Sequence, residues 1–571
     1  MSDVLFLILR RLRAPLIVLI IAYAIAVIGL TFMPGQLPDG RPWKMGLFHA
    51  FYVISYTATT IGLGELPHPF SDAQRLWLTL SIYITVIAWT YTLGSIFTLI
   101  ADTTFRAAIS RSVFAWRVRT LADPFYVLCG YGQSARAIAH ALDRMGIRVV
   151  VIESRKERAS SIAIETFTSA AIVLSEDARL PKVLRDAGIY KRECRGLIAL
   201  TGDDKANQAI AIGARTLRPE LHVMARVKTD AARINLESFG GVDVINPFDT
   251  FAQNVALDLD HPEVLRLEEW LTATPDAACP ARIGVPAGPW VIVGFGRFGQ
   301  SIASVLDDRG IAWRAIDNRT LDELTDGRDR VLVAENMERA LREADIEHAA
   351  VLVAGTDNDA ANLAAVTLAR RVNAHVWTII RQNHIADRVL IRAAKSNLRF
   401  VQSDIMVHEC LQLINEPLLG VFLKRMRQEG GAFAADALAR IQARVGNGAP
   451  LAFAFACDLL QPGVFFAKLQ QGLPLTIDAL LLDRETGESQ RALALMLLRG
   501  SDMVLLPSED TVVMNGDRLL FVGSEESRRL LQSVSADPSQ MAILLTGIEP
   551  PRTWLFRKIA AWRQARRPSY E

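Results

Sequence analysis

The chain has 571 residues, of which 51% are hydrophobic and 22% are charged, and its mean hydropathy is +0.21. This composition is too apolar for a disordered protein, and the length predicts about three or four domains. Lys and Arg (63) nearly balance Asp and Glu (61), which argues against a nucleic-acid-binding protein that relies on bulk positive charge. The five cysteines are far apart and form no CxxC pair, so neither a disulfide scaffold nor a zinc knuckle is expected.

Two long uncharged runs near the N-terminus are predicted to be membrane-spanning helices. Residues 14–33 and 76–101 are each long enough to cross a hydrocarbon core of about 30 Å. A cleaved signal peptide is the alternative for the first run, but no obvious small-residue cleavage site follows it and a second span does. Arginines precede the first span and follow the second. The positive-inside rule therefore predicts a multi-pass protein of the plasma (inner) membrane with both termini in the cytoplasm.

The connection between the two spans contains the most specific motif. Residues 34–46 are predicted to form an exposed turret, and residues 47–58 a re-entrant half-helix too short to span. Residues 59–65 (TTIGLGE) then follow at membrane depth, where non-helical backbone is tolerated only if it is buried or lines a cavity. Stacked carbonyls that coordinate a dehydrated cation would meet this requirement, because glycine allows the dihedral angles that point successive carbonyls the same way. A tight extracellular turn between two anchor helices is the alternative.

Residues 57–65 (TATTIGLGE) resemble the T-x-T-T-V-G-Y-G-D signature of the potassium channel pore family. The resemblance implies that Thr60, Ile61, Gly62 and Leu63 bind potassium, that Gly64 ends the filter, and that Glu65 stands at its outer mouth. Leu63 replaces the usual aromatic residue and Glu65 the usual Asp, two departures that bear on filter rigidity and on selectivity for potassium over sodium.

The same resemblance implies a homotetramer, because one hairpin cannot enclose a pore. Gly94 lies within the second span. It is either a gating hinge or a small residue that allows close helix packing.

The cytosolic remainder contains an internal repeat. An apolar strand pattern leads into a glycine turn and then a helix pattern at residues 126–144 and again at 291–309, and an acidic residue follows the first glycine by 23 positions in both copies. This is the dinucleotide-binding fingerprint, in which glycines let the backbone approach a pyrophosphate and the carboxylate receives ribose hydroxyls. The candidate nucleotide-binding residues are Gly130, Tyr131, Gly132, Gln133, Ser134, Glu153 and Arg155 in the first copy, and Gly294, Phe295, Gly296, Arg297, Phe298, Gly299 and Asp317 in the second.

Later strand patterns repeat as well. Residues 196–201 are followed by Asn207, and residues 350–355 are followed by Asn362. Alternating strands and helices predict a parallel, doubly wound sheet in each copy. The pattern resembles the RCK (regulator of potassium conductance, or TrkA-N type) domain, with residues 250–270 as the helical crossover of the first copy, and residues 446–530 resemble the small β-rich domain that often follows RCK lobes.

The predicted fold is therefore multi-domain. An α-helical transmembrane pore domain of two helices plus a re-entrant pore helix precedes two α/β Rossmann-like RCK domains and a small C-terminal α+β domain. The expected limits are 1–101 for the pore domain, 102–123 for a linker, 124–287 and 288–445 for the two RCK domains with their crossovers, 446–535 for the C-terminal domain and 536–571 for a basic tail. The tail suits an amphipathic helix attracted to anionic lipid or another subunit, and a solvated helix docked on its own ring is the alternative.

The acidic residues of the fingerprints indicate the ligand. Glu153 and Asp317 favour NAD(H) over a dinucleotide with a 2′-phosphate, which a carboxylate would repel. A simple adenine nucleotide remains an alternative, and so does a glycine turn kept only for the fold. Arg155 could contact phosphate.

Calcium is a further candidate ligand, since some RCK channels bind it through carboxylates beside the strand at residues 222–228. In this chain Arg226 and Lys228 occupy that strand and would repel a hard cation. A different calcium site could be built from the acidic residues Glu176, Asp177, Asp203 and Asp204. Acidic loop residues are usually only solvated.

No His or Lys constellation supports a dehydrogenase, so an enzyme is not expected. The sequence predicts a ligand-gated potassium channel in which a nucleotide shifts the geometry of a cytosolic ring and pulls on the inner helices through residues 102–123. Its expected partners are other copies of the chain, the lipid bilayer and the nucleotide, but no nucleic acid. The alternatives are a non-conducting, membrane-anchored nucleotide sensor that regulates a separate transporter, and an NAD-dependent membrane oxidoreductase.

Overall fold

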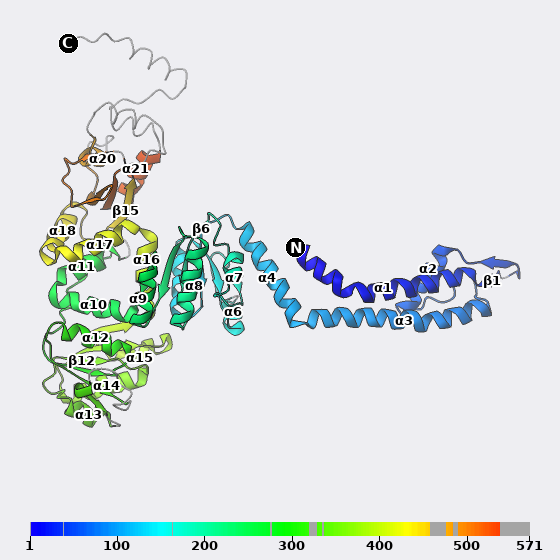
Figure 1. The fold of residues 1–571 in the computed structure, drawn as a ribbon, viewed down its shortest axis with the longest axis horizontal. Coiled ribbons are helices and arrows are strands. Elements are labelled where there is room, and N and C mark those ends of the chain that lie inside the picture. Colours follow the sequence, from blue (N-terminus) through cyan, green and yellow to red (C-terminus); the bar gives the residue numbers. More distant parts are fainter. Residues whose placement is uncertain are drawn as a thin grey trace, which may run out of the picture. The chain divides into compact units, whose positions relative to one another are not determined.

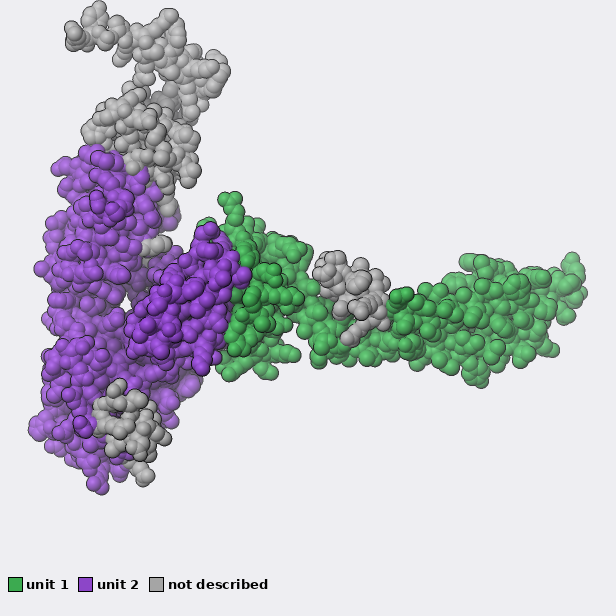
Figure 2. Space-filling view, in the orientation of Figure 1, with its two compact units in different colours: residues 1–127, 150–166, 170–195 green, residues 128–149, 167–169, 196–571 purple. Residues whose placement is uncertain are grey.

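The structure is a computed structural model. It describes residues 2–37, 39–162, 164–273, 277–318, 328–333, 336–456, 475–482, 489–514 and 516–536. The chain divides into two compact units, which are residues 1–127, 150–166 and 170–195, and residues 128–149, 167–169 and 196–571 (Figure 2).

Three helices and a short hairpin form the N-terminal part of the first unit (Figure 1). The helices are α1 (Ser2–Phe32), α2 (Leu47–Ala58) and α3 (Asp72–Ala101), and the antiparallel strands β1 (Pro34–Gln36) and β2 (Pro42–Lys44) lie in the expected turret. The stretches Leu12–Phe32 and Asp72–Ala101 are long and apolar enough to cross a membrane, so the two predicted apolar helices are confirmed. Helix α2 has the same bounds as the predicted half-helix.

Helix α2 packs between the two long helices. Leu30, Val53 and Ile54 are fully buried in their shared apolar cluster. The Trp77 indole N–H of α3 donates a hydrogen bond to the Ala26 carbonyl of α1 (3.0 Å), and Ser71 caps the start of α3 through a capping box with Gln74. These contacts fix the position of α2 relative to α1 and α3, and with it the point at which residues 59–65 begin.

The expected linker is helical over most of its length, in α4 (Thr103–Thr120). Asp102 ends α3 and caps α4, since its carboxylate accepts hydrogen bonds from the Thr104 and Phe105 N–H groups. At the other end, the Lys191 ammonium donates to the carbonyls of Val118 (3.2 Å) and Arg119 (3.0 Å). A cation at a helix C-terminus also complements the helix dipole. Helix α4 is therefore attached directly to the first lobe.

The first lobe contains a six-stranded sheet in the order β5-β4-β3-β6-β7-β8. Its strands are β3 (Phe125–Cys129), β4 (Arg148–Ile152), β5 (Ile172–Leu174), β6 (Cys194–Ala199), β7 (His222–Arg226) and β8 (Val242–Ile245). Its helices are α5 (Gln133–Arg144), α6 (Lys156–Ile162), α7 (Pro181–Asp186), α8 (Asp204–Leu217) and α9 (Asp230–Phe239).

The second lobe repeats this topology in the order β11-β10-β9-β12-β13-β14. Its strands are β9 (Trp290–Val293), β10 (Trp313–Asp317), β11 (Val331–Val333), β12 (Val351–Ala354), β13 (Trp377–Gln382) and β14 (Leu398–Val401). Its helices are α12 (Arg297–Asp307), α13 (Met337–Glu343), α14 (Asp359–Val372) and α15 (Arg388–Ala393), with the 3-10 turns η2 (Arg328–Arg330) and η3 (Ile385–Asp387). All of its strand pairs are parallel, which confirms the predicted doubly wound sheet.

Long helices follow each sheet. They are α10 (Pro247–Asp260) and α11 (Pro262–Leu271) after the first, and α16 (Gln402–Asn415), α17 (Pro417–Glu429) and α18 (Gly431–Arg444) after the second. The predicted helical crossover at 250–270 consists of two helices, because Pro262 disfavours helical backbone at the preceding residue and ends α10. Helix α10 packs against α12, and α16 packs against α5, so the crossover helices connect the two lobes.

The C-terminal domain is built on a four-stranded antiparallel sheet in the order β15-β20-β17-β18. Its elements are β15 (Leu451–Ala456), β16 (Leu475–Thr476), α20 (Ile477–Leu481), β17 (Ala492–Arg499), β18 (Asp502–Leu505), β19 (Val512–Val513), β20 (Arg518–Gly523) and α21 (Glu525–Ala536). The predicted small α+β domain is thus confirmed. The basic tail beyond residue 536 lies outside the described residues.

A cluster of charged side chains lies between α11, α16 and α17. The Arg427 Nε donates to Oε2 of Glu268 (3.0 Å), whose side chain is only 5% exposed. Glu409 of α16 shares this environment, and burial, with a smaller contribution from the Glu268 charge, raises the pKa of Glu409 to about 7. Its neighbour His408 is also buried, which lowers the pKa of that imidazole.

Replacing Glu409 with Gln is expected to change the pH dependence of stability. The folded Glu409 carboxyl has a pKa of about 7, whereas an unfolded Glu has a pKa of about 4.3. The protonated carboxyl therefore stabilises the fold fully below the unfolded pKa, and about 4 kcal/mol of that stability is lost as pH rises through 7, of which about 2–3 kcal/mol is lost between pH 5 and 8. Unfolding of the wild-type chain and of Glu409→Gln, measured between pH 5 and 8, should show this loss only in the wild type. Equal slopes would contradict the assignment.

Candidate functional site

The segment after α2 has an alternating backbone conformation. Thr60, Gly62 and Gly64 have φ angles of +62°, +64° and +93°, whereas Ile61 and Leu63 lie outside the left-handed region. Glycine and left-handed backbone at alternate positions allow successive carbonyls to point the same way, as a row of cation ligands requires. A left-handed threonine is costly, and backbone strain of this kind is concentrated at functional sites.

Four consecutive carbonyl groups in this segment are unpaired. The carbonyls of Thr60, Ile61, Gly62 and Leu63 accept no hydrogen bond from any described residue, whereas the N–H of Ile61 donates to the Tyr56 carbonyl (2.9 Å). The segment therefore uses its N–H groups for internal support and leaves its carbonyls available. These are the four residues predicted to bind potassium.

Two side chains hold the end of the segment. The Tyr56 hydroxyl of α2 donates to the Gly64 carbonyl. The carboxylate of Glu65 accepts hydrogen bonds from Arg75 Nε (2.8 Å) and the Phe70 N–H (2.8 Å), and these bonds lower the pKa of Glu65. Leu63 stands where an aromatic residue is usual, and its side chain is 51% exposed. The hydrogen bond from Tyr56 to the Gly64 carbonyl thus supports the segment without an aromatic ring at position 63.

Gly94 lies in the continuous helix α3. A Cβ built at this position meets no atom within 4 Å among the described residues. Close packing within the described part of the chain therefore does not explain this glycine, and the hinge remains a prediction.

A second site is a cavity of about 620 Å³ at the carboxyl ends of the strands of the second lobe. Of the predicted residues, Gly294, Gly296, Arg297 and Asp317 line it. The others do not: Phe298 is fully buried and stacks on Phe400 (ring centroids 4.5 Å apart), and Phe295 stacks on Trp313. Those two aromatic residues belong to the core.

The glycines of this turn have separate structural reasons. Gly294 has a φ of +90°, and a Cβ there would lie 2.9 Å from the Thr356 backbone N. A Cβ on Gly299 would lie 2.3 Å from the Gly294 carbonyl oxygen, so this glycine allows close packing of helix on strand. A Cβ on Gly296 meets nothing within 4 Å, and the N-terminus of α12 has no side-chain cap. The space beside Gly296 and the free helix N-terminus suit an anionic ligand.

Two guanidinium groups face the ring of Phe248 in this cavity. The Cζ atoms of Arg297 and Arg381 lie 5.7 and 5.4 Å from the ring centroid. Burial lowers the pKa of Arg381, Asp357 opposes the shift, and the Arg297 charge adds to it. An incompletely compensated, desolvated cation gains when an anion binds beside it. The cavity is therefore suited to phosphate groups.

Asp317 is buried at the end of β10. Its Oδ2 accepts a hydrogen bond from the Phe295 N–H (2.6 Å), which ties the carboxylate to the glycine turn. The acidic residue thus has a structural contact in addition to its predicted role toward ribose.

A buried asparagine joins two strand ends next to this cavity. The Asn362 side chain bonds Thr356 N–H (2.9 Å), Thr356 Oγ1 (2.7 Å) and the carbonyls of Thr356 and Arg381. Asn207 makes the same four bonds to Thr201 and Arg226 in the first lobe. The repeated asparagine therefore positions the strand end that carries each arginine.

The glycine turn of the first lobe has the same geometry. Gly130 has a φ of +90°, and a Cβ there would lie 2.9 Å from Thr201, whereas a Cβ on Gly132 would be unobstructed. Tyr131 and Ser134 are buried, and Gln133 begins α5.

The two remaining predicted residues of the first lobe belong to the other compact unit. There Oε1 of Glu153 accepts hydrogen bonds from the Arg155 N–H (2.9 Å) and Ser154 Oγ (3.4 Å). The carboxylate thus orders the start of the segment that follows β4.

Comparison with known proteins agrees with this repeat. Residues 126–247 and 290–398 both match the TrkA-N domain family. Both lobes are TrkA-N domains.

The chain is also similar to named relatives. The chain is 26% identical over 227 residues to potassium channel protein 1 of Methanocaldococcus jannaschii, a match that covers 40% of this chain and 66% of the relative. It is 24% identical to probable potassium channel protein 2 of the same organism, over 35% of this chain and 57% of the relative. The chain thus spans less than two thirds of the length of these relatives. Among solved structures, the GsuK channel bound to NAD is 16% identical, with a TM-score of 0.45, over 94% of this chain and 100% of that chain.

Three of the four acidic residues considered for calcium, Asp177, Asp203 and Asp204, have protein partners in the first lobe. Asp203 caps α8 through the Lys205 N–H (3.0 Å), and Asp204 accepts bonds from the Lys228 N–H (2.9 Å) and Thr229 Oγ1 (3.0 Å). Asp177 pairs with Arg179 (2.7 Å). Within the described ranges, no three or more His, Cys, Asp or Glu side chains group to hold a metal ion.

Sequence analysis missed Tyr56, Phe248 and Arg381. For Arg381 a signal existed, because Arg226 and Arg381 occupy equivalent strand ends of the repeat. Phe248 comes from α10, which the sequence assigns to the first lobe, so only the packing of α10 on α12 brings it to the second site.

Replacing Tyr56 with Phe removes the hydroxyl that supports the Gly64 carbonyl. We expect the variant to fold normally but to lose about fivefold in preference for potassium over sodium, in line with the loss of one hydrogen bond of about 1 kcal/mol. Competition between the two cations in ion flux from reconstituted vesicles measures this preference. Tyr52→Phe on the same helix is the control, and an unchanged ratio in Tyr56→Phe would contradict the supporting role.

Two glycine substitutions in the second TrkA-N lobe are expected to separate folding from binding. Gly296→Val should leave thermal stability unchanged but abolish nucleotide binding at the second lobe, because its side chain enters open space beside the turn. Gly294→Ala should instead destabilise the lobe by about 1–3 kcal/mol, because of its positive φ and the contact with Thr356. Thermal unfolding and calorimetric titration with NAD test both expectations. Wild-type NAD affinity in Gly296→Val would rule out this turn as the binding site.

Proposed function

We propose that this chain is the subunit of a homotetrameric, ligand-gated potassium channel of the plasma membrane, with both termini in the cytoplasm. The observation that supports this proposal most directly is the row of carbonyls at residues 60–63, which accept no hydrogen bond from any described residue. The row lies between two helices that are long enough to span a membrane. Dehydrated cations bind to such rings of carbonyls. The named potassium channel relatives support the same function.

The filter segment requires several copies. One chain contributes one row of carbonyls, and a dehydrated cation needs such groups on all sides. Four copies around one axis would supply them and would keep the carbonyls away from lipid.

The TrkA-N lobes are proposed to sense a nucleotide, with NAD(H) or another adenine nucleotide as the ligand. In the second lobe, the space beside Gly296 and the N-terminus of α12 fit a pyrophosphate, and Arg297 and Arg381 would neutralise it. The carboxylate of Asp317 favours an unphosphorylated ribose. When bound, the nucleotide supplies negative charge beside the buried guanidinium of Arg381.

A sensor is favoured over an enzyme. The described lining of the cavity contains Asp317, Asp357, Arg297 and Arg381 as its charged groups, with no His, Lys or Cys. The site is therefore built to hold a ligand rather than to move a proton at neutral pH.

Assembly of a cytosolic ring is consistent with exposed apolar side chains on both lobes. Ile234 (53% exposed) and Phe239 lie on α9 of the first lobe. Val389 (76% exposed) and Leu390 lie on α15, which follows the equivalent strand in the second. Contiguous exposed apolar residues favour protein contacts, and neighbouring lobes of a ring would cover them.

Helix α4 is the proposed connection between sensor and pore. It begins at the residue that ends α3, and its C-terminal carbonyls are held by Lys191 of the first lobe. A nucleotide moves the gate only if it binds the open and closed rings with different affinities. The proposal also includes the domain boundaries expected from the sequence, which end the successive domains at residues 101, 123, 287, 445 and 535.

The second candidate is a non-conducting, membrane-anchored nucleotide sensor that regulates a separate transporter. An anchor has no use for four adjacent unpaired carbonyls. The channel is therefore the better-supported proposal.

Cation flux through vesicles reconstituted with the full chain tests the proposal. We expect potassium flux to exceed sodium flux and to change at least severalfold when NAD is added on the cytosolic face. Gly296→Val should conduct but should lose the part of the NAD response that the second lobe contributes. Folded, tetrameric protein that passes no potassium with or without nucleotide would favour the non-conducting anchor.

A further inference from the structure

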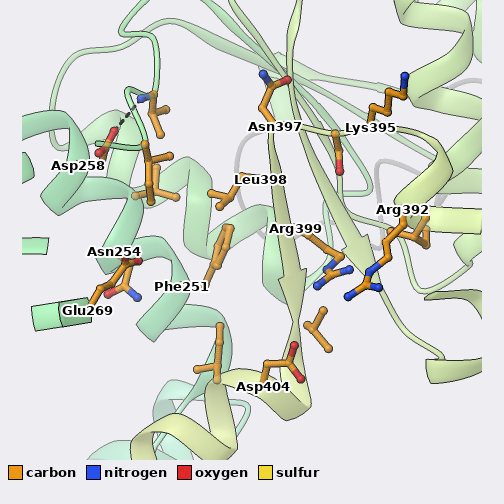
Figure 3. Close-up of a pocket in the computed structure, with 17 residues that line it drawn as sticks. Phe251, Asn254, Asp258, Glu269, Arg392, Lys395, Asn397, Leu398, Arg399 and Asp404 are labelled. Atoms are coloured by element: carbon orange, nitrogen blue, oxygen red, sulfur yellow. Dashed lines mark hydrogen bonds between the residues drawn. The ribbon is translucent and has the colours of Figure 1, made fainter. Parts of the chain in front are cut away.

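The second lobe contains another cavity, of about 470 Å³, on the side of β14 that faces α10, α11 and α16 (Figure 3). It shares no described lining residue with the cavity at the glycine turn. Its volume lies in the range of small-molecule sites, which runs from about 300 to 1,000 Å³. This cavity is therefore a candidate binding site in its own right, distinct from the glycine turn.

One end of the cavity is cationic. Arg392 of α15 and Arg399 of β14 direct their guanidinium groups toward one another (Figure 3). Neither side chain forms an ion pair or hydrogen bond with any described residue, although Asp404 lies on the same wall. Two like charges that face one another without a counter-ion are stabilised by an anion placed between them.

The loop that joins these arginines is held in place from behind. Lys395 has a φ of +48°, which is a strained conformation for a residue with a side chain. Arg370 donates to the Lys395 carbonyl (2.9 Å), and the Asn397 side-chain oxygen accepts from the Thr378 N–H (2.9 Å). The cationic end is therefore preorganised, which lowers the entropic cost of binding.

The opposite end of the cavity offers acceptors. Oδ1 of Asn254 is buried and has no hydrogen-bond partner among the described residues. Glu269 lies beside Asn254 (Figure 3), and burial raises the pKa of its carboxyl. Asp258 accepts the Val285 N–H (2.7 Å) and so holds the loop that covers this end. A buried acceptor without a donor costs free energy, so a donor is expected to occupy the space in front of it.

An apolar middle separates the two ends. Phe251 and Leu398 lie between the acceptor end and the arginines (Figure 3). The lining therefore matches a molecule that has an anionic group at one end and hydrogen-bond donors at the other.

We propose that this cavity binds a small phosphate monoester, with the phosphate between Arg392 and Arg399 and a hydroxyl or amino group of the ligand donating to Asn254. A phosphate monoester carries close to two negative charges at neutral pH and offers three acceptor oxygens, which match two guanidinium forks better than one carboxylate does. The cavity suits a sugar phosphate or mononucleotide better than a dinucleotide. The site is independent of the proposed pore function.

Packed helices connect this cavity to the two glycine turns. The ligand would contact α10 and α16 together, and these helices pack against α12 and α5, the helices that follow the two glycine turns. A bound phosphate would therefore alter nucleotide affinity, and the nucleotide would alter phosphate affinity by the same factor.

Titration calorimetry on the full chain tests the proposal, with inorganic phosphate, ribose 5-phosphate, ribose and citrate as probes. We expect inorganic phosphate and ribose 5-phosphate to bind and ribose and citrate not to bind. The double variant Arg392→Gln, Arg399→Gln should weaken both phosphate probes at least tenfold. Arg388→Gln, an exposed arginine on α15 outside the cavity lining, is the matched control and should bind normally.

A second variant tests the acceptor end. Asn254→Leu should weaken ribose 5-phosphate severalfold and leave inorganic phosphate unchanged, because only the sugar reaches Asn254. Thermal unfolding of each variant checks that the lobe is folded. The proposal is overturned if no phosphate probe binds the wild-type chain, if the double arginine variant retains wild-type affinity, or if citrate binds as tightly as ribose 5-phosphate.

Discussion

The need to satisfy backbone carbonyls at membrane depth is the constraint on which the proposed assembly depends. Residues 60–63 present four carbonyls that no described group pairs, while Tyr56 and Glu65 hold the segment at its C-terminal end. In hydrocarbon, each unpaired carbonyl would cost several kcal/mol. A dehydrated cation surrounded by several copies of the segment removes that cost. The proposed conduction and the proposed assembly therefore depend on the same groups.

The cytosolic lobes satisfy their polar groups in a different way. Asn207 and Asn362 each join two strand ends through four hydrogen bonds, so the backbone beside each glycine turn is fixed by the protein itself. The group whose charge is only partly compensated is the buried guanidinium of Arg381, which shares the Phe248 ring with Arg297. The proposed pore segment thus offers acceptors to a cation, and the second lobe offers a buried guanidinium to an anion. One chain that has both features can connect ion flow to a nucleotide.

The sequence predicted the fold with few errors because its signals are local. The bounds of α2 and both glycine turns follow from apolar run length and from glycine spacing. The predicted helical crossover consists of two helices, α10 and α11, since Pro262 acts at its own position rather than through the overall pattern. The candidate site was predicted only in part. Phe298 has the spacing of a ligand contact but is directed into the core against Phe400, and Phe248 reaches the cavity only because α10 packs across from the other lobe. Contacts between elements distant in sequence leave no local signal.

An experimental structure of the full chain in potassium, determined by electron cryomicroscopy, would test the central claim most directly. The account predicts four copies around one axis, with ion density on that axis between the carbonyls of residues 60–63. An assembly in which these carbonyls instead accept hydrogen bonds from protein groups, or in which the segments do not meet at a common axis, would contradict it.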